Sequence, residues 1–204
     1  WLARAGVSPN MISVASVVFA ILGSAGLLAT DAFTSPLIST VAWATAIGGI
    51  QLRLIANLLD GMLAVEAGQA SATGPLYNEV PDRLSDPILL IAAGHAYSGS
   101  VDAGWAAACM ALLVAYTRAI AASVGTRQLF LGPMAKQHRM ALLTFTCIAG
   151  LVLPRPWMIF PMGTDRCGVV EFALWLIVAG GIVTVIRRLR AAANFLRESQ
   201  ATEL

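Results

Sequence analysis

The sequence predicts an all-α, polytopic membrane protein: a bundle of six transmembrane helices with both termini on the cytoplasmic side. Apolar residues make up 58% of the 204 residues, charged residues only 12%, and the mean hydropathy is +0.76. A soluble domain carries about a quarter charged residues, so this composition indicates an integral membrane protein. We expect one membrane domain over residues 1–204. Because the chain begins with Trp1 and not with Met, we expect a further N-terminal segment.

Six segments are expected to form helices, approximately residues 11–29, 37–66, 75–97, 104–124, 140–153 and 169–190. The first follows Ser8-Pro9-Asn10, a helix-start signal, and has the roughly 20 apolar residues that a membrane span needs. The second is longer than one span, so its last turns should reach the aqueous interface. Pro75 suits the first turn of the third helix, and Pro81 should loosen that turn.

The second half of the chain alternates apolar runs with breaks. Residues 98–103 form a short turn before the fourth helix, and Gly132-Pro133 interrupts the chain before the fifth. A loop containing Pro and Gly is expected over residues 154–168. The sixth helix should end in Arg187-Arg188-Leu189-Arg190 and continue as a helical tail to Arg197.

Basic residues set the expected orientation. With six spans and cytoplasmic termini, the outer loops hold only Arg155 and Arg166. This asymmetry agrees with the positive-inside rule. The net charge of +2 gives no reason to expect nucleic-acid binding, and the three cysteines form no C-x2-C pair that would favour zinc or redox chemistry. The basic residues expected on the inner side are Arg4, Arg83, Arg127, Lys136, Arg139, Arg187, Arg188, Arg190 and Arg197.

Acidic residues gather between residues 57 and 86. Asn57 and Asp60 share one face of the second helix, and Asn78, Asp82 and Asp86 form a stripe along the third. Two such stripes would repel one another unless a cation lay between them. Carboxylate and amide oxygens favour Mg²⁺ or Mn²⁺. The pattern therefore predicts metal-assisted phosphoryl chemistry at a membrane surface.

The same stretch resembles the CDP-alcohol phosphotransferase family, whose signature is D-x2-D-G-x2-A-R-x8-G-x3-D-x3-D. Every spacing is reproduced here, with Asp60, Gly61, Ala64, Gly74 and Asp82 in place. This sequence departs from the signature at three positions. Asn57 and Asn78 stand where the family has aspartates, and Val65 stands where it has arginine.

The resemblance implies a membrane transferase that moves a substituted phosphate, such as phosphatidyl, from a CDP-alcohol to an alcohol acceptor and releases CMP. CDP-diacylglycerol is the common bacterial donor, which implies phospholipid synthesis at the bacterial inner membrane with the site facing the cytoplasm. Asp82 would be the catalytic base. Mg²⁺ or Mn²⁺ would be held by Asn57, Asp60, Asn78 and Asp82, with Asp86 as an additional candidate. Nucleotide contacts are implied for Asn10, Asn57, Asp60, Gly61, Ala64, Gly74 and Asn78, and a homodimer is an arrangement found in the family.

Basic residues before the fifth helix resemble the family segment associated with the acceptor phosphate. Lys and Arg suit anionic groups on physical grounds as well. Arg118, Arg127, Lys136 and Arg139 are the candidates for acceptor or lipid-phosphate binding. The alternative is that these residues are only a positive-inside topology signal.

Several alternatives stay open at the level of sequence. Arg53, one turn before Asn57, is either a functional group or the ion-pair partner of Asp86. Asp86 itself either restores negative charge to the metal site or pairs with Arg53 or Arg118. Asn10 is either a helix cap or a nucleotide contact. The amides at positions 57 and 78 also allow a degenerate member that binds nucleotide or lipid without turnover. A small transporter is a third class, against which the matched spacing argues.

Overall fold

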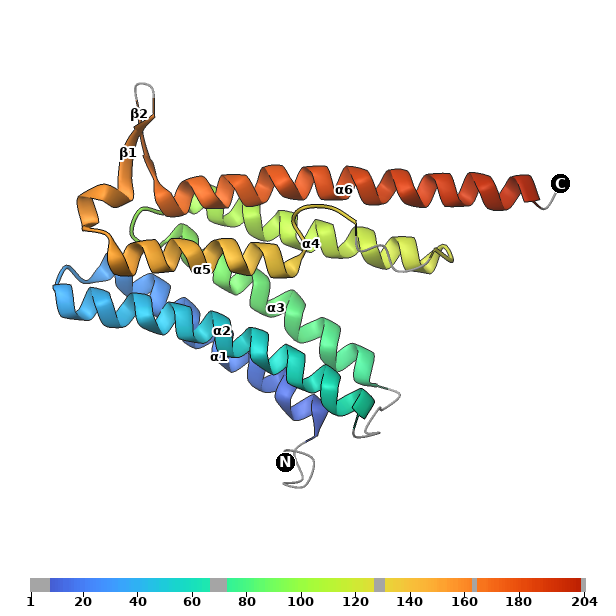
Figure 1. The fold of residues 1–204 in the computed structure, drawn as a ribbon, viewed down its shortest axis with the longest axis horizontal. Helices are drawn as coiled ribbons and strands as arrows, with labels where there is room; N and C mark the ends of the chain where they lie inside the picture. Colours follow the sequence, from blue (N-terminus) through green and yellow to red (C-terminus); the bar gives the residue numbers. More distant parts are fainter. Residues whose placement is uncertain (1–7, 67–72, 127–130, 163–164, 203–204) are drawn as a thin grey trace.

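The computed structural model describes residues 8–66, 73–126, 131–162 and 165–202, and it is nearly all helical (Figure 1). Side chains at positions 64–66, 75, 165 and 202 lie outside the description. Between the last two helices a short 3₁₀ helix leads into a two-stranded antiparallel hairpin. The elements in chain order are α1 (Pro9–Ala32), α2 (Pro36–Glu66), α3 (Gly74–Gly94), α4 (Val101–Ser123), α5 (Lys136–Val152), η1 (Arg155–Met158), β1 (Ile159–Met162), β2 (Asp165–Gly168) and α6 (Val169–Thr202).

The six predicted helices are present in the described part of the chain, and four of them are long and apolar enough to cross a membrane. These four are α1, α2, α4 and α6. α5 has only 17 residues. α3 carries Glu79, Asp82, Arg83 and Asp86 within two turns, which lowers its hydropathy. Integral membrane character follows from the four spans, while the count of six spans and the cytoplasmic termini stay predictions.

The structure corrects three boundaries. The predicted loop over residues 154–168 contains η1 and the hairpin, in which Phe160 pairs with Cys167. The ring of Phe160 also meets that of Phe172 edge-to-face with centroids 6.1 Å apart, which seats the hairpin on the start of α6. α5 begins at Lys136 and not at residue 140, because its basic first turn is helical although it is not apolar. α3 ends at Gly94, three residues before the predicted end.

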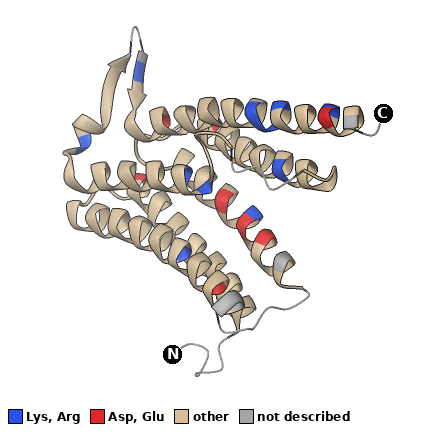
Figure 2. Cartoon of the chain, turned by 45° about the vertical axis from the view of Figure 1, so that its right-hand side comes forward, with Lys and Arg blue, Asp and Glu red and all other residues tan. Residues whose placement is uncertain are grey.

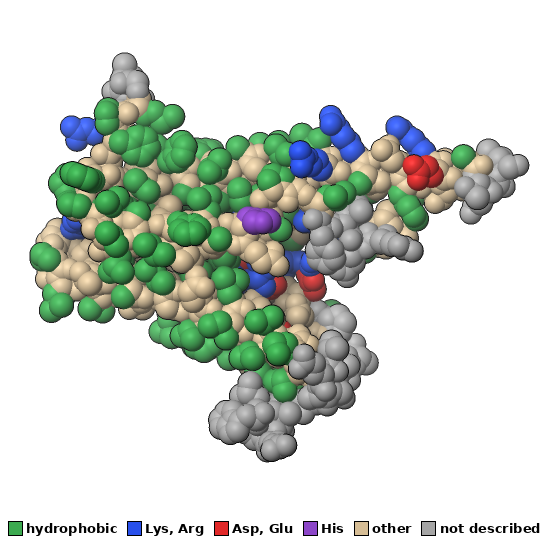
Figure 3. Space-filling view, viewed as in Figure 1, with side chains coloured by type: hydrophobic (Ala, Val, Ile, Leu, Met, Phe, Trp, Pro, Cys, Tyr) green, Lys and Arg blue, Asp and Glu red, His purple; other side chains and the backbone are tan. Residues whose placement is uncertain are grey.

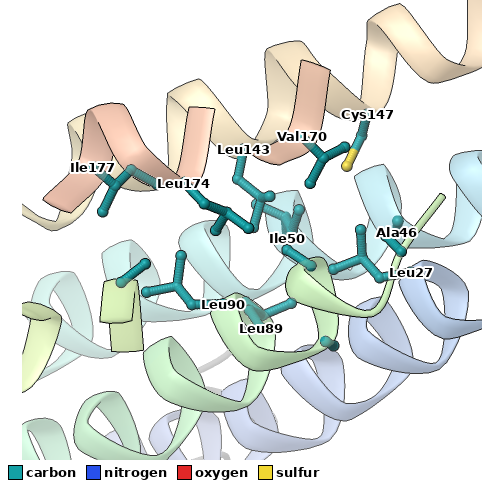
Figure 4. Packing of buried hydrophobic residues seen from close by; sticks show 14 of the residues in the cluster. Leu27, Ala46, Ile50, Leu89, Leu90, Leu143, Cys147, Val170, Leu174 and Ile177 are labelled. Atoms are coloured by element: carbon teal, nitrogen blue, oxygen red, sulfur yellow. The ribbon is translucent and has the colours of Figure 1, made fainter. Parts of the chain in front are cut away.

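The core lies where the six helices face one another, and α4 contributes small side chains such as Ala107 and Ala111 (Figure 4). Leu27 and Ile50 meet Leu89 and Leu90 in its centre, and α5 and α6 close it from the other side. Most exposed side chains on the helices are also apolar (Figure 3), as expected for surfaces that contact lipid. The core side chains that α5 and α6 supply include Leu143, Cys147, Val170, Leu174 and Ile177.

Glycines bring α1 and α2 into close contact. A Cβ added to Gly49 would lie 2.4 Å from the backbone of Gly23, and one added to Gly26 would lie 2.6 Å from the backbone nitrogen of Ala46. Small residues allow this approach. In lipid the hydrophobic effect does not drive helices together, so they associate mainly through such close packing. The α1–α2 pair therefore forms a tight unit, against which α3 packs through the other face of α1.

One end of the bundle is closed by a small polar network. The backbone N–H of Tyr97 donates to Thr30 Oγ1 at 3.0 Å, and Arg155 donates to the carbonyl of Thr30 at 2.5 Å. The guanidinium of Arg155 also lies 4.3 Å from the centroid of the Tyr97 ring. Most other described charges lie toward the opposite end, on the first half of α3, the start of α5 and the second half of α6 (Figure 2). That opposite end holds the acidic residues singled out by the sequence.

Gly49→Ala should destabilise the protein, because its Cβ would overlap backbone atoms of α1. We expect a loss of about 1–3 kcal/mol for such overpacking. Gly48→Ala is the matched control, since a Cβ there meets nothing within 4 Å. It should be neutral or stabilising, as Ala favours helix over Gly by about 1 kcal/mol. Thermal unfolding in detergent measures both, and equal effects would contradict the close α1–α2 contact.

Candidate active site

Asp60 lies near the end of α2 and is buried, with 3% of its surface exposed. Its Oδ2 accepts a hydrogen bond from Ser13 Oγ at 2.5 Å, which connects α2 to the first turns of α1. Its Oδ1 is buried and has no hydrogen-bond partner among the described residues. A desolvated carboxylate oxygen without a donor is costly. This oxygen is therefore the place in the site best suited to receive a cation.

Asp82 lies on α3 and is surrounded by donors from two other helices. Lys136 Nζ, at the start of α5, lies 2.6 Å from both carboxylate oxygens. Arg53 Nη2 and Asn57 Nδ2, one turn apart on α2, lie 3.2 Å and 3.1 Å from Oδ1. The carboxylate is thus held by two cations and an amide before any ligand arrives.

Asp86, one turn further along α3, is a partner of buried arginines. Arg53 Nη2 lies 2.6 Å from its Oδ1, and Arg139 Nη2 lies 2.5 Å from its Oδ2. Arg53 is completely buried and Arg139 nearly so. The predicted ion pair between Arg53 and Asp86 is present, while a contribution of either residue to a metal site stays a prediction. The second partner of Asp86 is Arg139. Arg118, the other partner considered from the sequence, pairs with Glu79 instead.

Arg118 belongs to a more exposed group with Glu79. Glu79 accepts hydrogen bonds from Arg83 on its own helix and from Arg118 on α4. These side chains border a polar pocket of about 220 Å³ that reaches Asp82 and Lys136. Acidic and basic side chains are visible in the hollow beside this region (Figure 3). The cations that line the pocket are Arg83, Arg118, Lys136, Arg139 and Arg188.

An apolar groove of about 900 Å³ adjoins the polar pocket along α4. Leu112, Leu113 and Tyr116 line the groove, whereas Glu79 and Arg118 line both cavities. The site therefore opens to charged groups on one side and to an apolar surface on the other.

Lys136, at the start of α5, has a partly buried side chain with charges of both signs around it. Burial lowers the pKa of its ammonium group, and the nearby Arg53 acts in the same direction. The carboxylate of Asp82 opposes both effects by favouring the charged form. The ammonium and carboxylate are therefore mutually dependent, and neither is well accommodated without the other.

The structure brings together part of the predicted residue set. Six predicted residues lie close together where α1, α2, α3 and α5 meet: Asn57, Asp60, Asp82, Asp86, Lys136 and Arg139. Asn78 is exposed and lines the polar pocket, while Gly61 has open space around its Cα. Gly74 begins α3. Arg127 and the side chain of Ala64 lie outside the described residues.

Asn10 is not the cap of α1. Ser8 is the N-cap, and its side chain accepts the backbone N–H of Met11 at 3.3 Å. Asn10 lies half-buried in the first turn, three residues before Ser13. This removes one of the two interpretations of Asn10, and its nucleotide contact stays a prediction.

Comparison with known proteins supports the fold and the family resemblance. No family model matches the chain. The chain is 27% identical over 211 residues to the phosphatidylinositol phosphate synthase of Streptomyces avermitilis, covering 98% of this chain and 78% of that protein. Its fold matches the phosphatidylinositol phosphate synthase of Mycobacterium tuberculosis, solved in complex with manganese and citrate, with a TM-score of 0.70 and 17% identity over 94% of this chain and 85% of the other.

A second structure of the mycobacterial enzyme, with CDP-DAG bound, matches equally well, with a TM-score of 0.70 over 94% of this chain and 89% of that one. The resemblance to the CDP-alcohol phosphotransferase family is confirmed. The relatives are named phosphatidylinositol phosphate synthases, and the variant signature of this chain begins on α2 and ends on α3.

Two residues of the site escaped the sequence analysis. Ser13 binds Asp60, and its only signal was a polar side chain one turn after Asn10 in an apolar run. Arg188 appeared to belong to a basic helix end, yet it is buried and donates to the carbonyls of Leu131 and Val114. It fastens the segment before α5 to α4, and this contact could not be read from sequence spacing.

Asp86→Asn should destabilise the protein strongly, because it leaves Arg53 and Arg139 with one carboxylate fewer. Loss of one partner from a buried ion pair costs about 3–5 kcal/mol. Glu79→Gln is the control, since its pairs are partly exposed and contribute about 0–1 kcal/mol. Unfolding in detergent should separate the two variants clearly. Similar, small effects in both would contradict a structural role for Asp86.

Proposed function

We propose that this chain is an integral membrane transferase that moves a phosphatidyl group from CDP-diacylglycerol to an alcohol acceptor and releases CMP. The observation that carries the proposal is the pair Asp60 and Asp82. They come from two different helices at the spacing of the family signature, and both are buried at the charged end of an otherwise apolar bundle. The names of the relatives support the same chemistry.

A divalent cation, Mg²⁺ or Mn²⁺, fits this proposal at Asp60. Its orphaned buried oxygen is suited to such an ion, and the mycobacterial protein of the same fold was solved with manganese. Asp60 would hold the ion, and the amide oxygens of Asn57 and Asn78 are further candidate ligands. The sequence also made Asp82, and additionally Asp86, candidate ligands of the ion. When bound, the ion would offset the charge of the pyrophosphate and of the departing nucleotide.

The protein's own residues would perform the remaining tasks. The acceptor hydroxyl attacks the phosphorus that bears the diacylglycerol, and the bond from that phosphorus to the CMP oxygen breaks. The proton of the hydroxyl passes to Asp82, which lines the polar pocket. Asn10, Gly61, Ala64 and Gly74 are proposed to contact the nucleotide. Arg118 would attract a phosphate on the acceptor, with Arg127 as a further candidate. Lys136 and Arg139 belong to the same predicted group, and their pairing with Asp82 and Asp86 limits them to adding positive charge beside that phosphate.

The orientation and location proposed from sequence are retained. The charged end would face the cytoplasm of a bacterial inner membrane, because most of the described Lys and Arg residues lie toward that end of the helices (Figure 2). In this arrangement the chain is one membrane domain of six spans with cytoplasmic termini. Membrane lipid and a second copy of the chain are its further partners.

A specific observation favours a second candidate, a degenerate relative that binds nucleotide or lipid without turnover. Asp82 is already neutralised by Lys136 and Arg53, and two carboxylates of the family signature are amides. A protein of this kind would bind CDP-diacylglycerol and release no CMP with any acceptor.

The test is CMP release from CDP-diacylglycerol by the purified protein, screened over acceptor alcohols with Mg²⁺ and Mn²⁺. Asp82→Asn should reduce the rate by about 10²–10⁴-fold, the usual range for loss of a general base, and Asp60→Asn should also reduce it. Asp102→Asn, in the first turn of α4, is a matched control that should keep the rate. Binding without release in the unaltered protein would favour the degenerate candidate.

The acceptor side of the pocket gives a separate test. Arg118→Gln should raise the KM for a phosphate-bearing acceptor about tenfold, since a hydrogen bond to a charged group contributes about 1.5–3 kcal/mol. Arg166→Gln is the control, because Arg166 is an exposed residue of the hairpin. An unchanged KM would leave Arg118 as a partner of Glu79 and a topology signal.

A further inference from the structure

The cations around Asp82 are part of the protein itself. Lys136 Nζ contacts both carboxylate oxygens at 2.6 Å, and Arg53 Nη2 contacts Oδ1 at 3.2 Å. Arg53 also reaches Asp86, which Arg139 pairs from the other side. The cluster of these five side chains contains two carboxylates and three cations, so its net charge is +1.

Asp60 differs from Asp82 in its immediate surroundings. Its described side-chain donor is the neutral hydroxyl of Ser13, and the backbone N–H of Gly61 also stabilises the carboxylate. Buried Oδ1 has no side-chain donor in the described part of the chain. A divalent cation placed on Asp82 would meet Lys136 and Arg53 within the first shell, where like charges repel strongly. The same ion placed on Asp60 would meet a carboxylate that forms no ion pair with the described Lys and Arg side chains, although the charge of Lys136 acts on it from further away.

The amide at position 57 is consistent with the fixed cations. Asn57 donates its Nδ2 hydrogen to Asp82 at 3.1 Å. An ionised aspartate at this position could not donate, and it would face Asp82 with like charge. Arg53 lies one turn earlier on the same helix and supplies positive charge to the same carboxylate. Asn57 and Arg53 thus both donate to Asp82 from α2. The family signature has an aspartate at the position of Asn57.

We propose that Arg53 and Lys136 are the resident counter-ions of Asp82, so that a divalent cation binds at Asp60 and not at Asp82. This inference rests on the proposed function for the presence of the cation, and it assigns the ion to one carboxylate of the site. Asp82 is then kept for contact with the acceptor, and Lys136 acts as a positioning residue through it.

The experiment measures Mn²⁺ binding to purified protein by calorimetry and by electron paramagnetic resonance, without substrate. Asp60→Asn should weaken binding at least about tenfold, as expected for loss of an ionised ligand. The double variant Asp82→Asn with Lys136→Met removes one negative and one positive charge, so the net charge of the cluster is unchanged. It should bind Mn²⁺ within about threefold of the unaltered protein.

Lys136→Met alone should strengthen Mn²⁺ binding by about tenfold or more, because it removes a positive charge next to the site. Arg83→Met is the matched control, since Arg83 pairs with the partly exposed Glu79, and it should change binding little. A loss in the charge-neutral double variant as large as that of Asp60→Asn would overturn the inference and leave the proposed function standing. An unaltered protein that binds no Mn²⁺ would overturn the metal part of both.

Crystals of the unaltered protein soaked in Mn²⁺ keep the test independent of how the variants fold. Anomalous density is expected within about 2.5 Å of an Asp60 oxygen, with Lys136 still on Asp82. Density coordinated by Asp82, with Lys136 displaced, would refute the assignment directly.

Discussion

A single guanidinium nitrogen connects the two carboxylates on which the charged end of this protein depends. Arg53 Nη2 lies between Asp82 and Asp86, which are one turn apart on α3. Lys136 and Arg139, one turn apart on α5, approach the same two carboxylates from the other side. Three helices are therefore joined by one alternating set of charges. Each helix contributes charges on one stripe only, so the set fixes their rotation about their own axes as well as their separation.

Such a cluster is not explained by stability alone. Burial of an ion pair costs several kcal/mol per ion, roughly what the attraction returns. Two donor nitrogens of Arg53, Nε and Nη1, have no partner among the described residues, which adds to the cost. An apolar residue at position 53 would avoid both penalties. Arg53 therefore adds little to stability by itself, and the tight α1–α2 contact and the apolar core compensate for its cost. A role for its positive charge in the site is part of the proposal that it is a counter-ion of Asp82.

The sequence predicted much of this protein because lipid imposes simple rules. Apolar runs predicted all six helices, and the signature spacing predicted that Asp60 and Asp82 belong to one site. The predictions of element boundaries failed where the local sequence is neither an apolar run nor a clear break. The hairpin at residues 159–168 lacks a strong strand pattern, and the first turn of α5 is basic, so a search for apolar periodicity starts that helix at Met140.

Pairings were harder to predict than positions. From spacing alone, Lys136 and Arg139 are candidates for an acceptor phosphate, and nothing indicates that they contact Asp82 and Asp86. Helical periodicity does show that the two basic and the two acidic residues each share a face. It does not show that α5 lies against α3 at that height, because this depends on the irregular segment before α5. Arg188 holds that segment through the carbonyls of Leu131 and Val114, and Arg188 lies some fifty residues further along the chain.

The fixed charges also have a consequence for how an anionic ligand would enter. The cations Lys136 and Arg139 are engaged by carboxylates, whereas Arg118 is shared with the half-exposed Glu79 at the border of the polar pocket. A phosphate entering this pocket competes with Glu79, which can be solvated if it is released, more readily than with the buried Asp82 or Asp86. The outer arginine can therefore change partners at modest cost while the inner cluster keeps its geometry. This division explains how one small region can contain many charges and still offer a positive surface to a ligand.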